Sequence, residues 1–74
     1  MERISVDPKI CHGKPCIKGT RIAVHMILDL LGAGETFDSI LQIYPHIAKD
    51  DILACIRYGS ALTTEETVFL HEAA

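Results

Sequence analysis

Apolar residues recur at helical spacing in the middle of the chain. A helix is predicted over 24–31, because its apolar residues occupy positions i, i+3, i+4 and i+7 and share one face: Val24, Ile27, Leu28 and Leu31. The same spacing recurs from Phe37 to Tyr44, where Thr36 is expected to cap the helix and Pro45 to stop it. The pattern therefore predicts two short helices in succession.

A third helix is predicted over 50–58, followed by a shorter fourth helix over 63–72. Asp50 and Asp51 suit the positive end of the third helix dipole, and Gly59 is expected to end that helix. Thr63 and Glu66 match a capping box, in which each side chain bonds the amide of the other residue. The third and fourth helices are accordingly expected to be separate.

Prolines and glycines exclude a long helix at the start of the chain. They favour short strands joined by tight turns: Pro8, Gly13, Pro15 and Gly19. Ile4 and Val6 alternate with Ser5 and predict a strand, while residues 16–18 and 21–24 are candidates for the returning strand. A β-hairpin or arm is expected over 4–23.

These elements predict one mainly α domain over residues 1–74. It comprises the β arm over 4–23, a three-helix core over 24–59 and a C-terminal helix or tail over 62–74. The short helices joined near Pro45, with helix 24–31 behind them, favour a three- to four-helix helix-turn-helix domain of homeodomain-like or winged-helix-like type. Such helices are also a simple way to build any small core, so a purely structural pair stays an alternative.

The length of 74 residues makes a stabilising partner expected. Below roughly 70–80 residues a single core seldom supplies more than about 3–5 kcal/mol. The three cysteines cannot all pair within one chain, and charges interrupt every apolar stretch before about 18 residues accumulate. We therefore expect a reduced, cytoplasmic protein without a membrane span, and a homodimer that covers apolar surface.

Charge is distributed unevenly along the chain. Residues 1–25 hold five basic and two acidic side chains, a net charge of +3, whereas residues 26–74 hold two basic and eight acidic ones, a net charge of −6. A basic arm on an acidic body locates any polyanion site on the arm. The candidate nucleic-acid-binding residues are Lys14, Lys18, Thr20, Arg21, Lys49 and Arg57. The alternative is architectural: Gly13 and Gly19 form turns, and Arg21 fixes the arm to the helices.

Two charges argue against a recognition helix over 50–58. Asp50 and Asp51 stand at its N-terminus, where phosphates would repel them, and only Lys49 and Arg57 favour contact with DNA. The neutral interpretation is that the two aspartates stabilise the helix end and the helix pair is scaffold.

No catalytic, cofactor or metal site is expected. Gly19 is followed by Thr20 without the lysine of a P-loop, and no nucleophile, base and orienting group stand at an interpretable spacing. Cys11, His12, Cys16 and His25 do not have the spacing of a standard zinc site. Cys55 is expected to be a small buried apolar residue. The protein is therefore not expected to be an enzyme.

Several short motifs resemble one protein family. Asp7-Pro8, the segment from Gly13 to Ile22, Gly34, Tyr44-Pro45 and Tyr58 are similar in order and spacing to Domain of Unknown Function 433, over roughly residues 4–60. The resemblance implies a helix-turn-helix-like fold with an N-terminal β element, and a role as the antitoxin of a bacterial toxin-antitoxin pair, similar to VapB-type antitoxins. The implied partner is a PIN-like ribonuclease toxin, and the resemblance carries over no catalytic residues.

An antitoxin of this kind must cover a basic RNA-binding cleft, for which acidic helices are suited. The candidate toxin-binding residues are Asp50, Asp51, Glu65, Glu66 and Glu72. A dimer would present two copies of the arm or of a helix to a palindromic operator. The alternative function is a protein-interaction or dimerisation module without DNA affinity.

Overall fold

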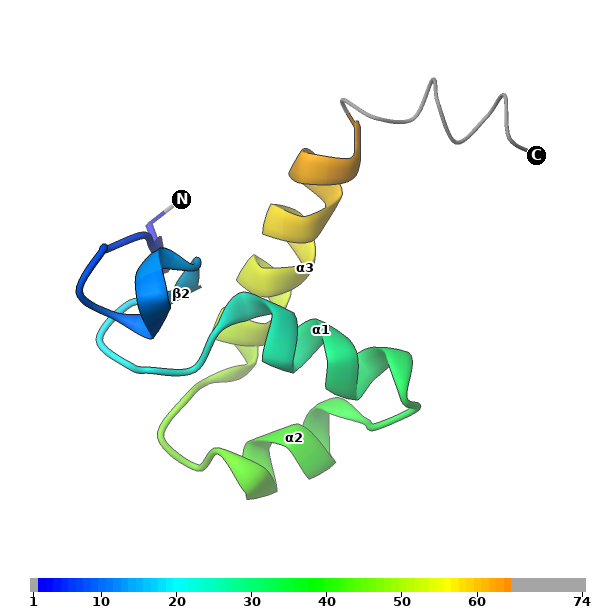
Figure 1. The fold of residues 1–74 in the computed structure, drawn as a ribbon. Coiled ribbons are helices and arrows are strands. Elements are labelled where there is room, and N and C mark those ends of the chain that lie inside the picture. The colour runs from blue at the N-terminus through cyan, green and yellow to red at the C-terminus, as the bar shows by residue number, and fades with distance from the viewer. Residues whose placement is uncertain (1, 65–74) are drawn as a thin grey trace.

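The structure is a computed structural model, which describes residues 2–64. Three helices contact one another, and a short hairpin lies beside the third helix (Figure 1). In chain order the elements are β1 (Ile4–Ser5), the 3-10 turn η1 (Cys11–Gly13), β2 (Cys16–Ile17), α1 (Val24–Gly32), α2 (Phe37–Ile43) and α3 (Lys49–Thr64). The mainly helical domain with a short antiparallel hairpin confirms this part of the prediction.

The ends of α2 follow from the residues expected to form them. Thr36 Oγ1 accepts a hydrogen bond from the Ser39 amide at 3.1 Å, and the Thr36 amide donates to Ser39 Oγ at 3.0 Å. This reciprocal pair satisfies two backbone donors that would otherwise lack partners at a helix start. Tyr44, with φ −122° and ψ 77°, has left the helix before Pro45. The predicted cap and stop of this helix are both confirmed.

The predicted end of the third helix at Gly59 is wrong. Helix α3 continues through Gly59 to Thr64, although glycine destabilises a helix interior by about 1 kcal/mol relative to alanine. A Cβ atom at position 59 would lie 3.0 Å from Leu28 Cδ1, so glycine allows α1 and α3 to approach closely. Tertiary packing thus outweighs the local tendency of glycine to end a helix.

Thr63 therefore lies inside α3 and does not begin a new helix. Its hydroxyl donates to the carbonyls of Gly59 and Ser60, each at 3.1 Å, and that of Thr64 donates to the Ser60 carbonyl at 2.8 Å. These are the bonds that a threonine within a helix makes to carbonyls three and four residues earlier. The remainder of the fourth helix predicted over 63–72 lies outside the described residues.

All three α-helices and both strands contribute to the core. The fully buried side chains are mostly branched aliphatic ones: Ile17 from β2, Ile27 from α1, Ile40 from α2 and Ile52 from α3, together with Cys16 and Cys55. No polar or charged side chain is buried among residues 2–64. The core is therefore held by apolar packing alone, and Cys55 is the small buried residue expected of it.

The hairpin is short and is completed by the start of α1. Ile4 pairs with Ile17 and Ser5 with Cys16 in antiparallel register, and Cys16 forms an isolated bridge with Ala23. The Val24 amide donates to the Pro15 carbonyl at 2.9 Å, which ties the first residue of α1 to the arm. Two strands this short are marginal alone, so their stability depends on the helices behind them.

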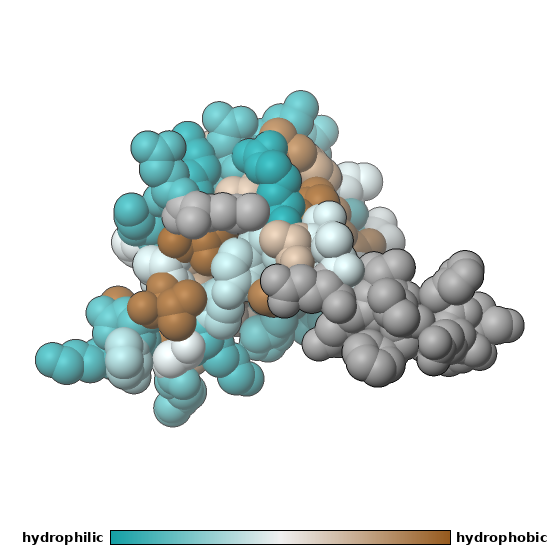
Figure 2. Space-filling model, turned by 90° about the horizontal axis from the view of Figure 1, so that it is seen from above, coloured by the Kyte–Doolittle hydropathy of each residue, from teal (hydrophilic) through white to brown (hydrophobic). Residues whose placement is uncertain are grey.

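Surface apolar residues are interspersed with polar ones on the face seen in Figure 2, where brown groups lie between teal side chains. The most exposed large aliphatic residues among those described are Val6, Ile43, Ile56 and Leu62. None of the helices within residues 2–64 has the length and apolar character needed to cross a membrane.

Truncation of a fully buried core residue should destabilise this domain strongly. Ile27→Ala should lower the free energy of unfolding by about 2–5 kcal/mol, because it removes buried methyl groups and leaves a cavity. Val6, which is 59% exposed, provides the control, and Val6→Ala should change that free energy by no more than about 0.5 kcal/mol. Urea denaturation followed by circular dichroism measures both, and equal effects would contradict the assignment of the core.

Candidate functional site

The turn after β2 is built from the Gly-Thr-Arg motif. Gly19 has φ +81°, a left-handed conformation that glycine adopts without steric strain. Thr20 Oγ1 donates to the Ile17 carbonyl at 2.8 Å and accepts from the Ile22 amide at 3.0 Å. The Ile17 amide donates to the Ile22 carbonyl at 2.9 Å and closes the loop. The Thr20 hydroxyl is thus engaged in forming the turn.

The Gly-Lys-Pro motif follows a second tight turn, whose backbone is unusual. Cys11 and His12 have φ values of +53° and +56°, and Gly13 has +80°. Such values are uncommon for residues that carry a side chain, and each stores conformational strain. The Cys11 thiol donates to the Arg21 carbonyl at 3.1 Å. This bond joins the two turns of the arm, so the arm is one connected unit.

The charged side chains on the two turns of the arm take no part in this hydrogen-bond network. Lys14, Lys18 and Arg21 are exposed, and none of them forms an ion pair within residues 2–64. The backbone of the same residues is engaged: the Lys18 amide donates to the Arg3 carbonyl at 2.8 Å, and the Arg21 carbonyl accepts from Cys11. The backbone of these motifs therefore helps to form the arm, whereas their charged side chains remain available for other contacts.

Arg3 differs from these cations because it is paired. Its guanidinium donates to Asp51 Oδ1 at 2.9 Å and lies 3.7 Å from Asp50 Oδ2, and the hydrogen bond to Asp51 raises the pKa of Arg3. Asp51 Oδ2 also accepts from the Ala48 amide at 2.8 Å, at the start of α3. Asp51 is only 13% exposed. The aspartates proposed for toxin binding thus hold the arm against α3.

The remaining candidates on α3 lie apart from the two turns of the arm. Lys49 is the exposed first residue of α3, and Arg57 lies two turns further along it. Arg57 borders a shallow polar hollow of about 220 Å³ with Glu2, Arg3 and Ala54. The other three proposed toxin-binding residues, Glu65, Glu66 and Glu72, lie outside the described residues.

Three exposed carboxylates that sequence reasoning did not single out lie on α1, on α2 and in the loop between them. Asp29, Glu35 and Asp38 are exposed, and no lysine or arginine occurs between Arg21 and Lys49. Asp29 is joined only to His25 at 3.3 Å among the described side chains. The signal was present in the sequence as this long interval without cations.

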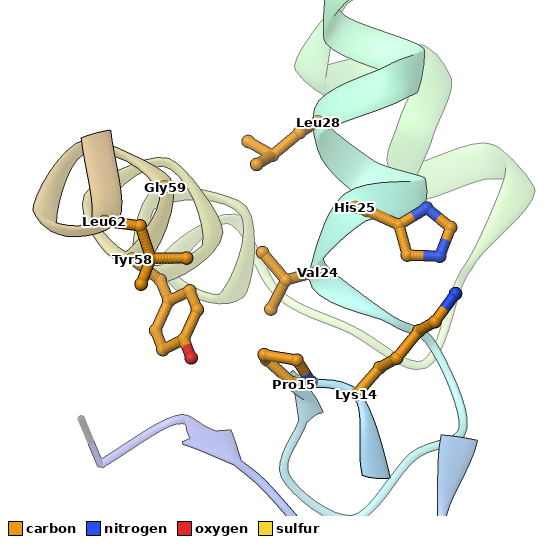
Figure 3. Close-up of a pocket in the computed structure, with 8 residues that line it drawn as sticks. All are labelled: Lys14, Pro15, Val24, His25, Leu28, Tyr58, Gly59 and Leu62. Carbon is orange, nitrogen blue, oxygen red and sulfur yellow. The ribbon is translucent and has the colours of Figure 1, made fainter. Parts of the chain in front are cut away.

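A pocket of about 380 Å³ opens beside the arm (Figure 3). The first half of α1 forms one wall, the C-terminal half of α3 faces it, and the Gly-Lys-Pro motif closes the lower side in Figure 3. Its lining is mostly apolar: Pro15, Val24, Leu28, Tyr58, Gly59 and Leu62, with Lys14 and His25 at one edge. Sequence reasoning missed this pocket, because its walls meet only when α3 continues past Gly59.

The described residues offer little for catalysis. No group of three or more His, Cys, Asp or Glu side chains within 2–64 is placed to hold a metal ion. Desolvation and the neighbouring Cys16 thiol raise the pKa of Cys11, and burial raises the pKa of Cys55 to about 11. Both thiols are therefore protonated at neutral pH, whereas nucleophilic cysteines need the thiolate.

Comparison with known proteins gives a family and a fold. The model of the family described as protein of unknown function (DUF433) matches residues 4–59. The crystal structure of a DUF433 member protein from Anabaena variabilis is similar, with a TM-score of 0.77 and 25% sequence identity over 97% of this chain and 69% of that chain. No curated protein matches the chain.

The double role of Asp51 predicts a difference between the two neighbouring aspartates. Asp51→Ala should lower the free energy of unfolding by about 1 kcal/mol, because it removes the acceptor for the Ala48 amide and the bond to Arg3. Asp50 is 66% exposed and 3.7 Å from Arg3, so Asp50→Ala should have an effect below about 0.5 kcal/mol. Thermal denaturation of both variants checks this, and an equal or reversed order would refute it.

Burial of Cys55 predicts a loss of stability in alkaline solution. An unfolded cysteine ionises near pH 8.5, whereas the folded protein retains this proton until about pH 11. Between these values the unfolded state binds fewer protons than the native state, so the free energy of unfolding must fall as the pH rises. Denaturation at pH 8 and pH 10.5 should show this fall, and it should be smaller in Cys55→Ala. An identical fall in both proteins would exclude Cys55 as its source.

Proposed function

Because the chain belongs to the DUF433 family, whose function is unknown, we propose that it is a non-catalytic, antitoxin-like regulator that binds nucleic acid through its N-terminal arm. The observation that carries the proposal is that the cationic side chains on the two turns of the arm are exposed and unpaired within the described residues. Lys14, Lys18 and Arg21 stand exposed on a bonded scaffold and are not consumed by ion pairs within the described part of the chain. Cations held in this way can neutralise phosphates.

The arm is a better candidate for nucleic-acid contact than the start of α3. In a helix-turn-helix protein the N-terminal residues of the recognition helix approach the base edges. Here Asp50 and Asp51 occupy that position and are engaged with Arg3. We therefore infer that, if α2 and α3 form a helix-turn-helix unit, it acts as scaffold, with Lys49 and Arg57 as secondary phosphate contacts.

The acidic residues of the molecule support the second activity of an antitoxin, which is to bind the toxin. A PIN-like ribonuclease toxin would present a basic RNA-binding cleft, and opposite charges favour its capture. Asp29, Glu35 and Asp38 are exposed, and no lysine or arginine occurs near them in the sequence. We assign toxin contact to these three carboxylates and to the glutamates at 65, 66 and 72, in a cytoplasmic bacterial protein that binds its operator as a homodimer.

The alternative function is a protein-interaction module without DNA affinity. The apolar pocket between α1 and α3 favours it, because nucleic-acid contacts are dominated by charged and polar groups whereas this lining is mostly aliphatic. Under this alternative Lys14, the one cation of the arm that lines the pocket, would lie at the edge of a protein-binding site.

A titration followed by fluorescence anisotropy separates the two functions. The full chain is added to a labelled duplex from the region upstream of its own gene and to a scrambled duplex, each at 50 mM and 200 mM salt. The proposed function predicts selective binding whose affinity falls with salt, because bound phosphates release counterions. Absence of binding to either duplex at both salt concentrations would favour the protein-interaction module.

Charge-removing variants locate the surface. Lys18→Ala/Arg21→Ala should weaken DNA binding at least tenfold and flatten the salt dependence by about two phosphate contacts. The matched control Lys49→Ala/Arg57→Ala removes the same charge from α3 and should weaken binding less. Both pairs are exposed, so folding should be retained. A larger effect of the control pair would move the site from the arm to α3.

A further inference from the structure

A mostly apolar pocket of about 380 Å³ lies between α1 and α3. Leu62, on its rim, is 57% exposed and lies beside Tyr58 on the α3 wall, across the pocket from Leu28 (Figure 3). Lys14 stands at the same edge as His25, with no ion-pair partner between residues 2 and 64 (Figure 3). The pocket therefore suits an occupant that brings large apolar side chains and at least one carboxylate.

The chain itself contains a segment with this chemistry. Residues 65–74 carry the apolar run Val68-Phe69-Leu70, flanked by Glu65 and Glu66 on one side and Glu72 on the other. Its three carboxylates match the net charge of +3 on residues 1–25, which include the Lys14 edge of the pocket. Apolar side chains flanked by carboxylates thus complement an apolar pocket that has at its edge the cation Lys14, which is unpaired among the described residues.

The covalent connection brings this segment within reach. Leu62 lines the pocket only two residues before Thr64, and Tyr58 lies six residues before Thr64, about 9 Å along the helix at 1.5 Å per residue. The five residues from Thr64 to Phe69 span up to about 17 Å when extended. Turns of two to five residues are sufficient to reverse a chain beside a helix. Tethering also gives a segment an effective concentration in the millimolar range, far above that of a second copy at micromolar concentration.

We propose that the pocket is the intramolecular docking site of segment 65–74, with Phe69 seated among Val24, Leu28 and Leu62 and a glutamate of the segment paired with Lys14. The docked segment covers apolar surface of a small domain and neutralises part of the arm. A partner that binds either the segment or the arm would then have to compete with this contact. The inference rests on the pocket and does not depend on DNA or toxin binding.

Nuclear magnetic resonance of the full chain tests the contact directly. Nuclear Overhauser effects are measured between the ring protons of Phe69 and the methyl groups of Val24, Leu28 and Leu62. The ring signals are assigned with Phe69→Leu, since Phe37 is the one other phenylalanine in the sequence. The proposal predicts contacts to all three residues that persist when the protein is diluted tenfold. Absence of any contact between the segment and the pocket overturns it.

Two further measurements exclude other occupants and indirect effects. Leu62→Asp should abolish these contacts, whereas the matched control Val6→Asp changes an equally exposed aliphatic residue outside the pocket and should retain them. Amide spectra that stay dispersed, with shifts confined to the pocket residues in Leu62→Asp and to the surroundings of position 6 in Val6→Asp, show that folding is intact. A mixture of isotope-labelled and unlabelled chains reports contacts between molecules. Effects seen only between molecules would assign the pocket to a second copy and overturn docking in cis.

Discussion

The close approach of α1 and α3 is the contact on which the rest of the structure depends. Leu28 fits against Gly59, where a Cβ atom would come within 3.0 Å of its side chain. Helix α3 runs through this contact for 16 residues, with buried side chains in its first half and pocket-lining ones in its second half, which faces α1. A glycine that destabilises an isolated helix is here the residue that allows two helices to pack.

A second constraint is that different groups of the arm serve for folding and for contact with solvent. Its backbone and small polar groups bond to one another, through the Thr20 hydroxyl and the Cys11 thiol, and Arg3 fixes it to α3 through Asp51. The other cations of its two turns, Lys14, Lys18 and Arg21, project from a scaffold that does not need them for cohesion. Side chains that are dispensable for folding are free to meet an anionic partner, and the proposed function builds on that property.

The charges also give the molecule two electrically different parts. The arm is basic, the α1–α2 end is acidic, and α3 carries equal numbers of both signs between Lys49 and Thr64. In this arrangement a polyanion and a basic protein would approach different surfaces. The apolar pocket lies beside the basic arm, so an acidic segment with apolar residues would satisfy both features at once.

The sequence by itself determined the local structure wherever a short-range rule applied. The spacing of Val24, Ile27 and Leu28 predicted α1, the Thr36 cap and Pro45 delimited α2, and the punctuation of residues 4–22 predicted the hairpin. These features depend on neighbours within a few positions, so they are visible in one dimension. Only the tertiary structure decided the rest. It carried α3 through Gly59, paired Arg3 with Asp50 and Asp51, and formed the pocket from residues 14–62, because each of these contacts joins positions far apart in the chain.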